Sequence, residues 1–71
     1  MTKDRDLYLQ RAAEARADAD SAELANVRER CLRAEAAWTV MAERAERTER
    51  LRQAQEAAKA DAAAKAAALT D

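Results

Sequence analysis

Apolar and alanine positions along the chain recur at alternating three- and four-residue spacings. The first set runs over Tyr8, Ala12, Ala15, Ala19 and Ala22. The second set runs over Leu24, Val27, Cys31, Ala34, Trp38, Met41, Ala45 and Thr48. Side chains at these spacings share one face of a helix, so the pattern predicts two helical stripes and an all-α fold.

The two stripes are out of phase, because the first, extended onward, would reach Asn26 and Glu29. The residues at 18–21 are Asp, Ala, Asp and Ser, and Asp and Ser favour helix N-caps over helix interiors. Asp20 and Glu23 also have the spacing of a capping box. We therefore expect an αα-hairpin with a turn near residues 18–21 and a long second helix. The absence of Gly and Pro leaves one continuous helix as the alternative.

A reversal near residues 19–20 predicts how the two helices pair. Antiparallel partners then have numbers that sum to about 40, which places Tyr8 beside Cys31 and Leu32. Beyond about residue 40 the second helix would continue bare. We accordingly divide the chain into a helical hairpin over residues 1–52 and an alanine-rich helical extension or tail over residues 53–71. Asp61, three alanines and Lys65 match the spacing of engineered helical spacers, so the origin of this tail stays open.

The composition is that of a small helical protein that needs a partner. The 71 residues include no Gly, Pro, Phe or His and one cysteine, and most hydrophobic residues are alanine. A chain of this size rarely gains more than roughly 3–5 kcal/mol from one hydrophobic core. One thiol without imidazoles supplies neither an internal disulfide nor a metal centre. We expect the missing stability to come from a second chain.

The candidate interface gathers most of the large apolar side chains. Trp38 and Met41 serve either as the core of the hairpin or as a surface for another chain, since large aromatic residues dominate interface energetics. Cys31 acts either as a small apolar core residue or, in a parallel dimer, as a partner for its own copy in a disulfide. The candidate interface residues are Tyr8, Leu24, Val27, Cys31, Leu32, Trp38 and Met41.

Charged residues flank the second stripe in an order that bears on orientation. With Leu24 as a heptad a position, the g positions hold Arg30 and Arg44. The e positions hold Glu35 and Glu49. A parallel coiled coil would pair these arginines and glutamates between chains, whereas an antiparallel one would oppose arginine with arginine. A parallel coiled coil and an antiparallel pair of hairpins forming a four-helix bundle both remain open.

Charge and residue types argue against most other functions. Thirteen basic and fourteen acidic side chains give a net charge of -1, which does not favour nucleic acid or an anionic membrane. No apolar run approaches the roughly 20 residues of a membrane span, and the first residues lack a signal peptide's apolar stretch, so we expect a cytoplasmic location. No nucleophile and base are placed for catalysis, so we expect no enzymatic activity and no cofactor.

A further resemblance rests on Tyr8, the run from Arg11 to Glu14, the Asp/Ser break, and then Val27, Arg28, Leu32, Ala36 and Trp38. Over residues 7–40 the chain resembles a loose group of short alpha-proteobacterial helical proteins, in which a tyrosine opens a charged helix and a second helix ends in an aromatic residue. It departs from that group's Pro in the turn and His before the leucine, where Glu23 or Ala25 and Cys31 stand. The resemblance implies a helical hairpin of bacterial, cytosolic origin and no particular activity.

These features together predict a non-enzymatic helical module for protein-protein interaction or homo-oligomerisation. Its expected partner is a second copy, as a dimer or higher oligomer, with another protein as a possible addition. The alternative is a regulatory or adaptor peptide that is partly disordered alone and folds on a larger protein, with Trp38 as its anchor.

Overall fold

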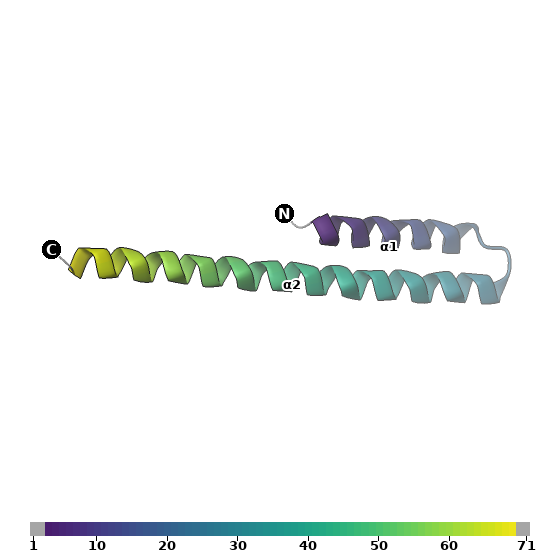
Figure 1. Cartoon of the computed structure of the whole chain (residues 1–71). Helices are drawn as coiled ribbons and strands as arrows, with labels where there is room; N and C mark the ends of the chain where they lie inside the picture. Colours follow the sequence, from purple (N-terminus) through teal and green to yellow (C-terminus); the bar gives the residue numbers. More distant parts are fainter. Residues whose placement is uncertain (1–2, 70–71) are drawn as a thin grey trace.

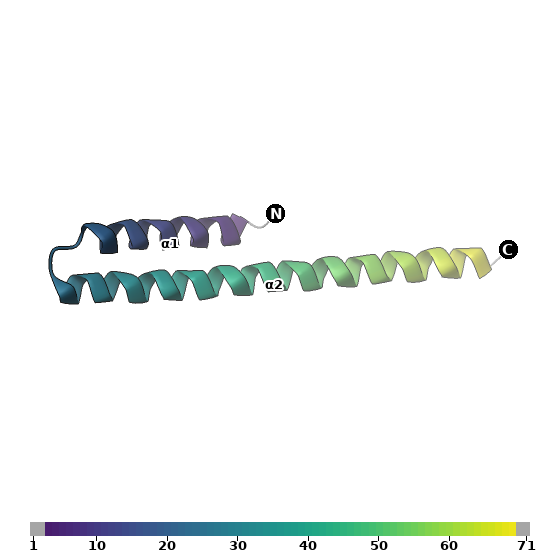
Figure 2. The same cartoon turned by 180° about the vertical axis from the view of Figure 1, so that it is seen from behind.

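The computed structural model describes residues 3–69, which fold as an antiparallel αα-hairpin (Figure 1). Helix α1 spans Lys3–Ser21 and helix α2 spans Ala25–Leu69. Because α2 is much longer, α1 lies alongside its first half only, and the rest of α2 projects as an arm (Figures 1 and 2). The predicted all-α hairpin with a long second helix is confirmed, and the single continuous helix is excluded.

The turn lies at residues 22–24, so the predicted turn near residues 18–21 and the predicted capping box are wrong. The polar side chains before it are satisfied without leaving the helix. Ser21 Oγ donates to the Asp18 carbonyl at 3.2 Å, and Asp20 forms an ion pair with Arg16 at 3.3 Å. Continuing α1 also keeps Ala19, which is 1% exposed, packed against α2.

Capping contacts close this turn without glycine. The backbone N–H of Ala22 donates to the Ala19 carbonyl at 3.2 Å, and the Arg28 guanidinium donates to the Ala22 carbonyl at 3.2 Å. The Leu24 carbonyl accepts the Arg28 N–H at 3.0 Å, which closes the first turn of α2. No residue of the described chain has a positive φ, so the turn has no position that favours glycine.

The later turn changes which residues face each other. Tyr8 stacks on Trp38, with ring centroids 5.9 Å apart, whereas we predicted it beside Cys31 and Leu32. The start of α1 reaches the end of the paired stretch, since Asp4 lines a groove together with residues 41–49 of α2. Every residue from 50 to 69 is exposed, so the bare helix begins near residue 50 and not near residue 40.

The centre of the hairpin is a seam of alanines. The buried side chains of the described residues are Ala12, Ala15, Ala19 and Ala42. Tyr8 and Ala22, at the two ends of the first predicted stripe, are half-buried, so the whole stripe faces α2 as predicted. Small side chains let two helices approach closely, but they bury little apolar area. Within residues 3–69, no side chain larger than alanine is buried.

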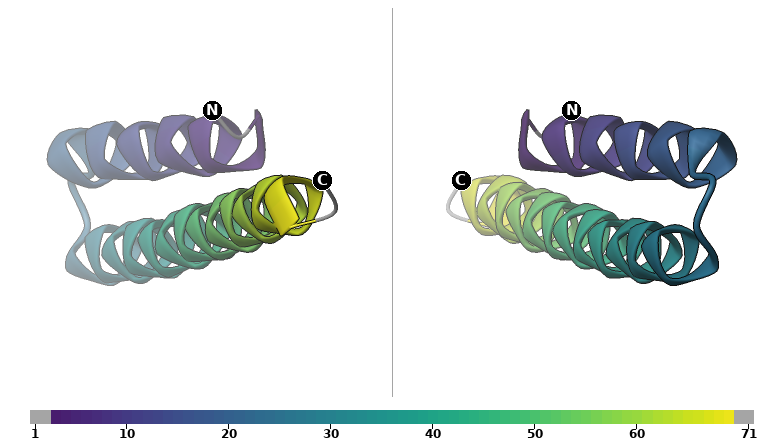
Figure 3. Two further views of the ribbon diagram at one scale, coloured as in Figure 1. Left: turned by 90° about the vertical axis from the view of Figure 1, so that its left-hand side faces the viewer. Right: turned by 90° about the vertical axis from the view of Figure 1, so that its right-hand side faces the viewer.

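The molecule is a thin rod with two helices in a single layer (Figure 3). It measures 72 × 14 × 11 Å and has a radius of gyration of 20.2 Å. A compact domain of the same length has a radius of gyration of about 11 Å. The chain exposes 5784 Å² of surface, whereas a compact monomer of its mass exposes about 4400 Å². The isolated hairpin therefore leaves far more surface open than a self-sufficient domain does.

Candidate interaction surface

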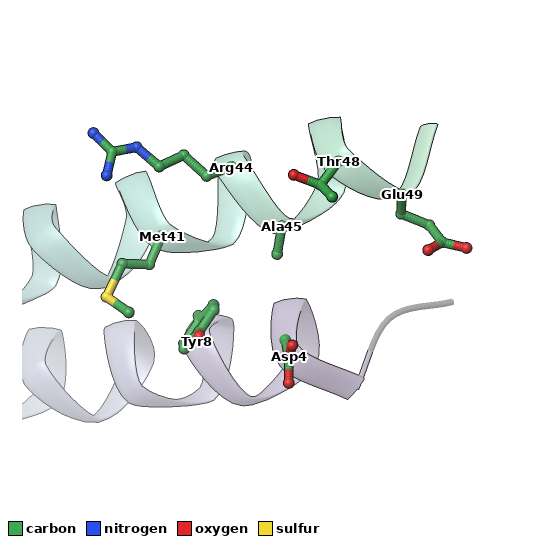
Figure 4. Close-up of a pocket in the computed structure, with 7 residues that line it drawn as sticks. All are labelled: Asp4, Tyr8, Met41, Arg44, Ala45, Thr48 and Glu49. Atoms are coloured by element: carbon green, nitrogen blue, oxygen red, sulfur yellow. The ribbon is translucent and has the colours of Figure 1, made fainter. Parts of the chain in front are cut away.

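A groove between the helices runs beside the stacked Tyr8 and Trp38 (Figure 4). The Met41 side chain reaches toward Tyr8, and Ala45 points across to α1, whereas the Arg44 guanidinium points away from α1. The groove has a volume of about 420 Å³ and is lined by Asp4, Tyr8, Met41, Arg44, Ala45, Thr48 and Glu49. Its floor is apolar and aromatic, and its rim is charged. We refer to the side of the hairpin that carries this groove as the groove face.

The apolar stripe of α2 drifts away from α1 along its length. Trp38 and Ala45 of the stripe are half-buried, but Met41 and Thr48 are exposed. Their neighbours Ala42 and Glu49 are less exposed, since Ala42 is buried and Glu49 is half-buried. The predicted stripe repeats every 3.5 residues, while a straight α-helix has about 3.6 residues per turn, so the stripe winds slowly around the helix. The drift turns Met41 into the groove, where it is 38% exposed.

The predicted interface residues divide into separate groups in the structure. Tyr8, Trp38 and Met41 come together at the groove. Val27 and Cys31 are half-buried in α2, and Cys31 is a free thiol. Two members lie apart from the groove: Leu24 is in the turn and 64% exposed, and Leu32 is 36% exposed on the side of α2 opposite Met41.

The four predicted flanking charges also divide. Glu35 forms an ion pair with Arg16 of α1 at 3.6 Å, and Glu49 forms one with Arg52 at 2.5 Å. Both glutamates are half-buried, whereas Arg30 and Arg44 are exposed. The two glutamates thus have partners within the chain, and their pairing with arginines of a second chain stays a prediction.

A cluster of charged side chains forms ion pairs along α2 at the point where α2 extends beyond α1. The Arg50 guanidinium donates to the Glu46 carboxylate at 2.6 Å, and this hydrogen bond lowers the pKa of Glu46. Arg52 bridges Glu49 and Glu56, with contacts of 2.5 and 2.6 Å. The hydrogen bond from Arg52 lowers the pKa of Glu49, and the same bond raises the pKa of Arg52. The lowered pKa values favour the ionised form of both Glu46 and Glu49.

One groove residue, Asp4, was not singled out from the sequence, and Thr48 was named only as the last member of the second stripe. Both line the groove, but the predicted pairing placed the start of α1 near Trp38 and left these two residues far apart. The alanine stripe held the signal that would have found them. It runs without interruption as far as Ala22, and a turn placed after it brings Asp4 to the level of Ala45.

The chain was compared with known protein families, curated proteins and solved structures. No protein-family model, no curated protein and no solved structure matches it. The resemblance to short alpha-proteobacterial proteins therefore stays a prediction. Over residues 3–69, neither helix combines the length and the apolar character required to cross a bilayer. The same stretch contains no group of three or more His, Cys, Asp or Glu placed to hold a metal ion.

Proposed function

We propose that the protein is a non-enzymatic self-association module whose groove face binds a second copy of the chain. One observation carries this proposal: Tyr8 and Met41 line a groove, Trp38 stacks on Tyr8 beside it, and the hairpin itself covers these large side chains only in part. Aromatic anchors that become fully desolvated on binding are typical of interface hot spots. Association would be driven by burial of apolar surface. We also propose the cytoplasmic location that the sequence predicts.

The exposed area is consistent with this reading. The chain exposes 5784 Å², which is about 1400 Å² more than a compact monomer of its mass. A stable protein interface buries about 800 Å² on each partner. Covering the groove face with a second hairpin would therefore bring the exposed area closer to the range of compact proteins.

A matched pair of glutamate substitutions tests the groove face. Met41→Glu places a charge in the groove, whereas Val40→Glu places the same charge at a neighbouring residue that is 44% exposed and points away from α1. An unpaired charge is costly to bury, so we expect Met41→Glu to weaken the dimer at least tenfold, or by about 1.4 kcal/mol. Val40→Glu should leave dimerisation near that of the unchanged chain. Sedimentation equilibrium at micromolar concentrations measures both.

Circular dichroism provides the control for this comparison. Both variants should keep the helix content of the unchanged chain at high concentration, because neither position is buried in the hairpin. A compact monomer of unchanged sequence with a cooperative thermal transition would overturn the proposal. Equal weakening by the two substitutions would also count against the groove face.

The bare arm favours a second candidate, an adaptor that folds on a larger protein. Residues 50–69 are all exposed and include Leu51 and Leu69, which are 60% and 85% exposed. A disordered segment that folds on binding makes a large contact surface with its partner, although it has little stability alone. Low helix content that does not change on dilution would favour this candidate over self-association.

A further inference from the structure

The two faces of the hairpin differ in how their charges are satisfied. On the face opposite the groove, Arg16 of α1 and Glu35 of α2 form an ion pair at 3.6 Å. Arg50 lowers the pKa of Glu46 on this face, and the charge of Arg5 on α1 adds a smaller effect in the same direction. The ion pair between Arg16 and Glu35 joins the two helices of one chain. Within residues 3–69, no ion pair joins the two helices on the groove face, and the aromatic pair beside the groove is only half-covered.

Four charges on the groove face form two matching sets. Asp4 and Asp18 lie fourteen residues apart on α1, and Arg30 and Arg44 lie fourteen residues apart on α2. Fourteen residues are about four helical turns, or about 21 Å, so the members of each set lie on the same side of their helix. All four residues are exposed, and no side chain of the four has an ion-pair partner within residues 3–69.

The hairpin also brings the two sets level with each other. Asp4 and Arg44 line the same groove, at the open end of the hairpin (Figure 4). Because the helices are antiparallel with equal rise per residue, Asp18 then lies level with Arg30, toward the turn. At both of these levels the groove face therefore has an aspartate on α1 and an arginine on α2.

We propose that two copies pack groove face to groove face and point in the same direction, so that α1 of each lies antiparallel to α2 of the other. In this four-helix bundle Asp18 meets the partner's Arg30, and Asp4 meets the partner's Arg44. The aromatic pairs of both chains are covered between these contacts. A copy pointing in the opposite direction would instead set aspartate against aspartate and arginine against arginine, which is unfavourable. This geometry rests on the proposed self-association and specifies its partner and orientation.

A charge exchange between two chains tests the contact between Asp18 and Arg30. Asp18→Arg alone opposes two arginines in each of the two symmetric contacts, and Arg30→Asp alone opposes two aspartates. We expect each variant to have a dimer Kd about tenfold higher than the unchanged chain at low salt, where exposed charges are least screened. A mixture of the two variants forms a heterodimer in which both contacts are again attractive, so we expect its Kd to return to the starting value.

Two controls accompany this exchange. Arg47→Asp makes the same change on the side of α2 that points away from α1, and it should leave the Kd unchanged. Recovery in the mixture also shows that both variant chains are able to adopt the fold of the dimer. Circular dichroism of each variant at high concentration gives the same check directly.

Small-angle scattering of the dimer measures the orientation independently. With both chains pointing in the same direction, both arms project from one end and the length stays near 72 Å. A reversed copy would add the second arm at the other end, about 20 residues or about 30 Å, for a total of about 100 Å.

The outcomes separate this geometry from the proposed function. Weakening by each single variant, recovery in the mixture and a length near 72 Å together support the geometry. A dimer that is insensitive to both charge changes, or that is about 100 Å long, overturns the geometry but leaves self-association standing. An unchanged chain that is monomeric at every concentration overturns both.

Discussion

Alanine determines how closely the two helices approach. Ala19 and Ala42 are 1% and 3% exposed, whereas every larger apolar side chain of the described residues is at least partly open to solvent. Alanine loses no side-chain entropy on burial and is the best helix former, so a seam of alanines costs little to order. It also contributes little apolar area, so the seam by itself supplies little hydrophobic stabilisation to the hairpin.

Enlarging one residue of the seam tests this close approach. We expect Ala19→Leu to lower the free energy of unfolding by about 1–3 kcal/mol, because a larger side chain has no space at a position that is 1% exposed. Urea unfolding followed by circular dichroism at a fixed protein concentration measures the change.

The matched control is Ala58→Leu, which makes the same substitution in the exposed arm. Leucine is nearly as good a helix former as alanine, so this variant should unfold within about 0.5 kcal/mol of the unchanged chain. If Ala19→Leu were as stable as the control, the two helices would have to be farther apart than the structure places them.

At the scale of the element, α2 has two unlike halves. Its first half is held by α1, and its second half is a bare helix that depends on alanine propensity and local ion pairs such as Asp61 with Lys65 at 3.2 Å. The charges around Glu46, Glu49 and Arg52 lie at the junction between the halves. We expect the arm to fray before the hairpin on heating.

The junction should make the stability of α2 sensitive to acid. Hydrogen bonds from Arg50 and Arg52 lower the pKa of Glu46 and Glu49 from the ordinary value of 4.5. The contribution of these two carboxylates to the free energy of unfolding is therefore complete above pH 4.5. It is lost as the pH falls through their lower pKa in the folded state. We expect the Tm to stay nearly constant from neutral pH down to about pH 5 and to fall below it.

Glu49→Gln identifies the part of this acid sensitivity that belongs to the junction. The variant should start with a slightly lower Tm at neutral pH and lose less on acidification, because it has no carboxylate to protonate. Glu43→Gln is the matched control, since Glu43 is exposed and no ion pair links it to another described residue. Parallel pH profiles for the unchanged chain and Glu49→Gln would contradict a stabilising role for this carboxylate.

The turn shows where reasoning about single elements failed. Residues 18–21 have the residue types of a helix N-cap, and from local preference alone the break belongs there. The chain instead continues through Ser21, because Ala19 gains contact with α2 and the polar side chains find partners along α1. The capping contact from Arg28 to Ala22 then closes the turn three residues later than predicted. Tertiary packing overrode a modest local preference.

At the scale of the whole molecule, the shape links stability to protein concentration. A rod of 72 × 14 × 11 Å with an open groove face has no complete core of its own. If a second copy supplies the rest of the core, folding and association become one equilibrium. We expect the Tm to rise by a few degrees for each tenfold increase in concentration.

Thermal melts over a hundredfold range of concentration measure this dependence. Met41→Glu should reduce the slope, because it blocks the groove face, while Val40→Glu should keep it. A Tm that is the same at every concentration would show that the hairpin folds alone, and the stability would then have to come from within a single chain.

The sequence by itself determined the helical class and the two stripes, and it favoured a reversal between them over one continuous helix. These features follow from local physical chemistry: alanine and charged residues favour helix everywhere, and the spacing of Tyr8, Ala12 and Ala15 depends only on the helical repeat. The tertiary structure decided the place of the turn, the stacking of Tyr8 on Trp38 and the exposure of Met41 in the groove. These depend on how far two helices slide along each other, and a seam of nearly identical alanines leaves that register open until the turn and the aromatic pair select it.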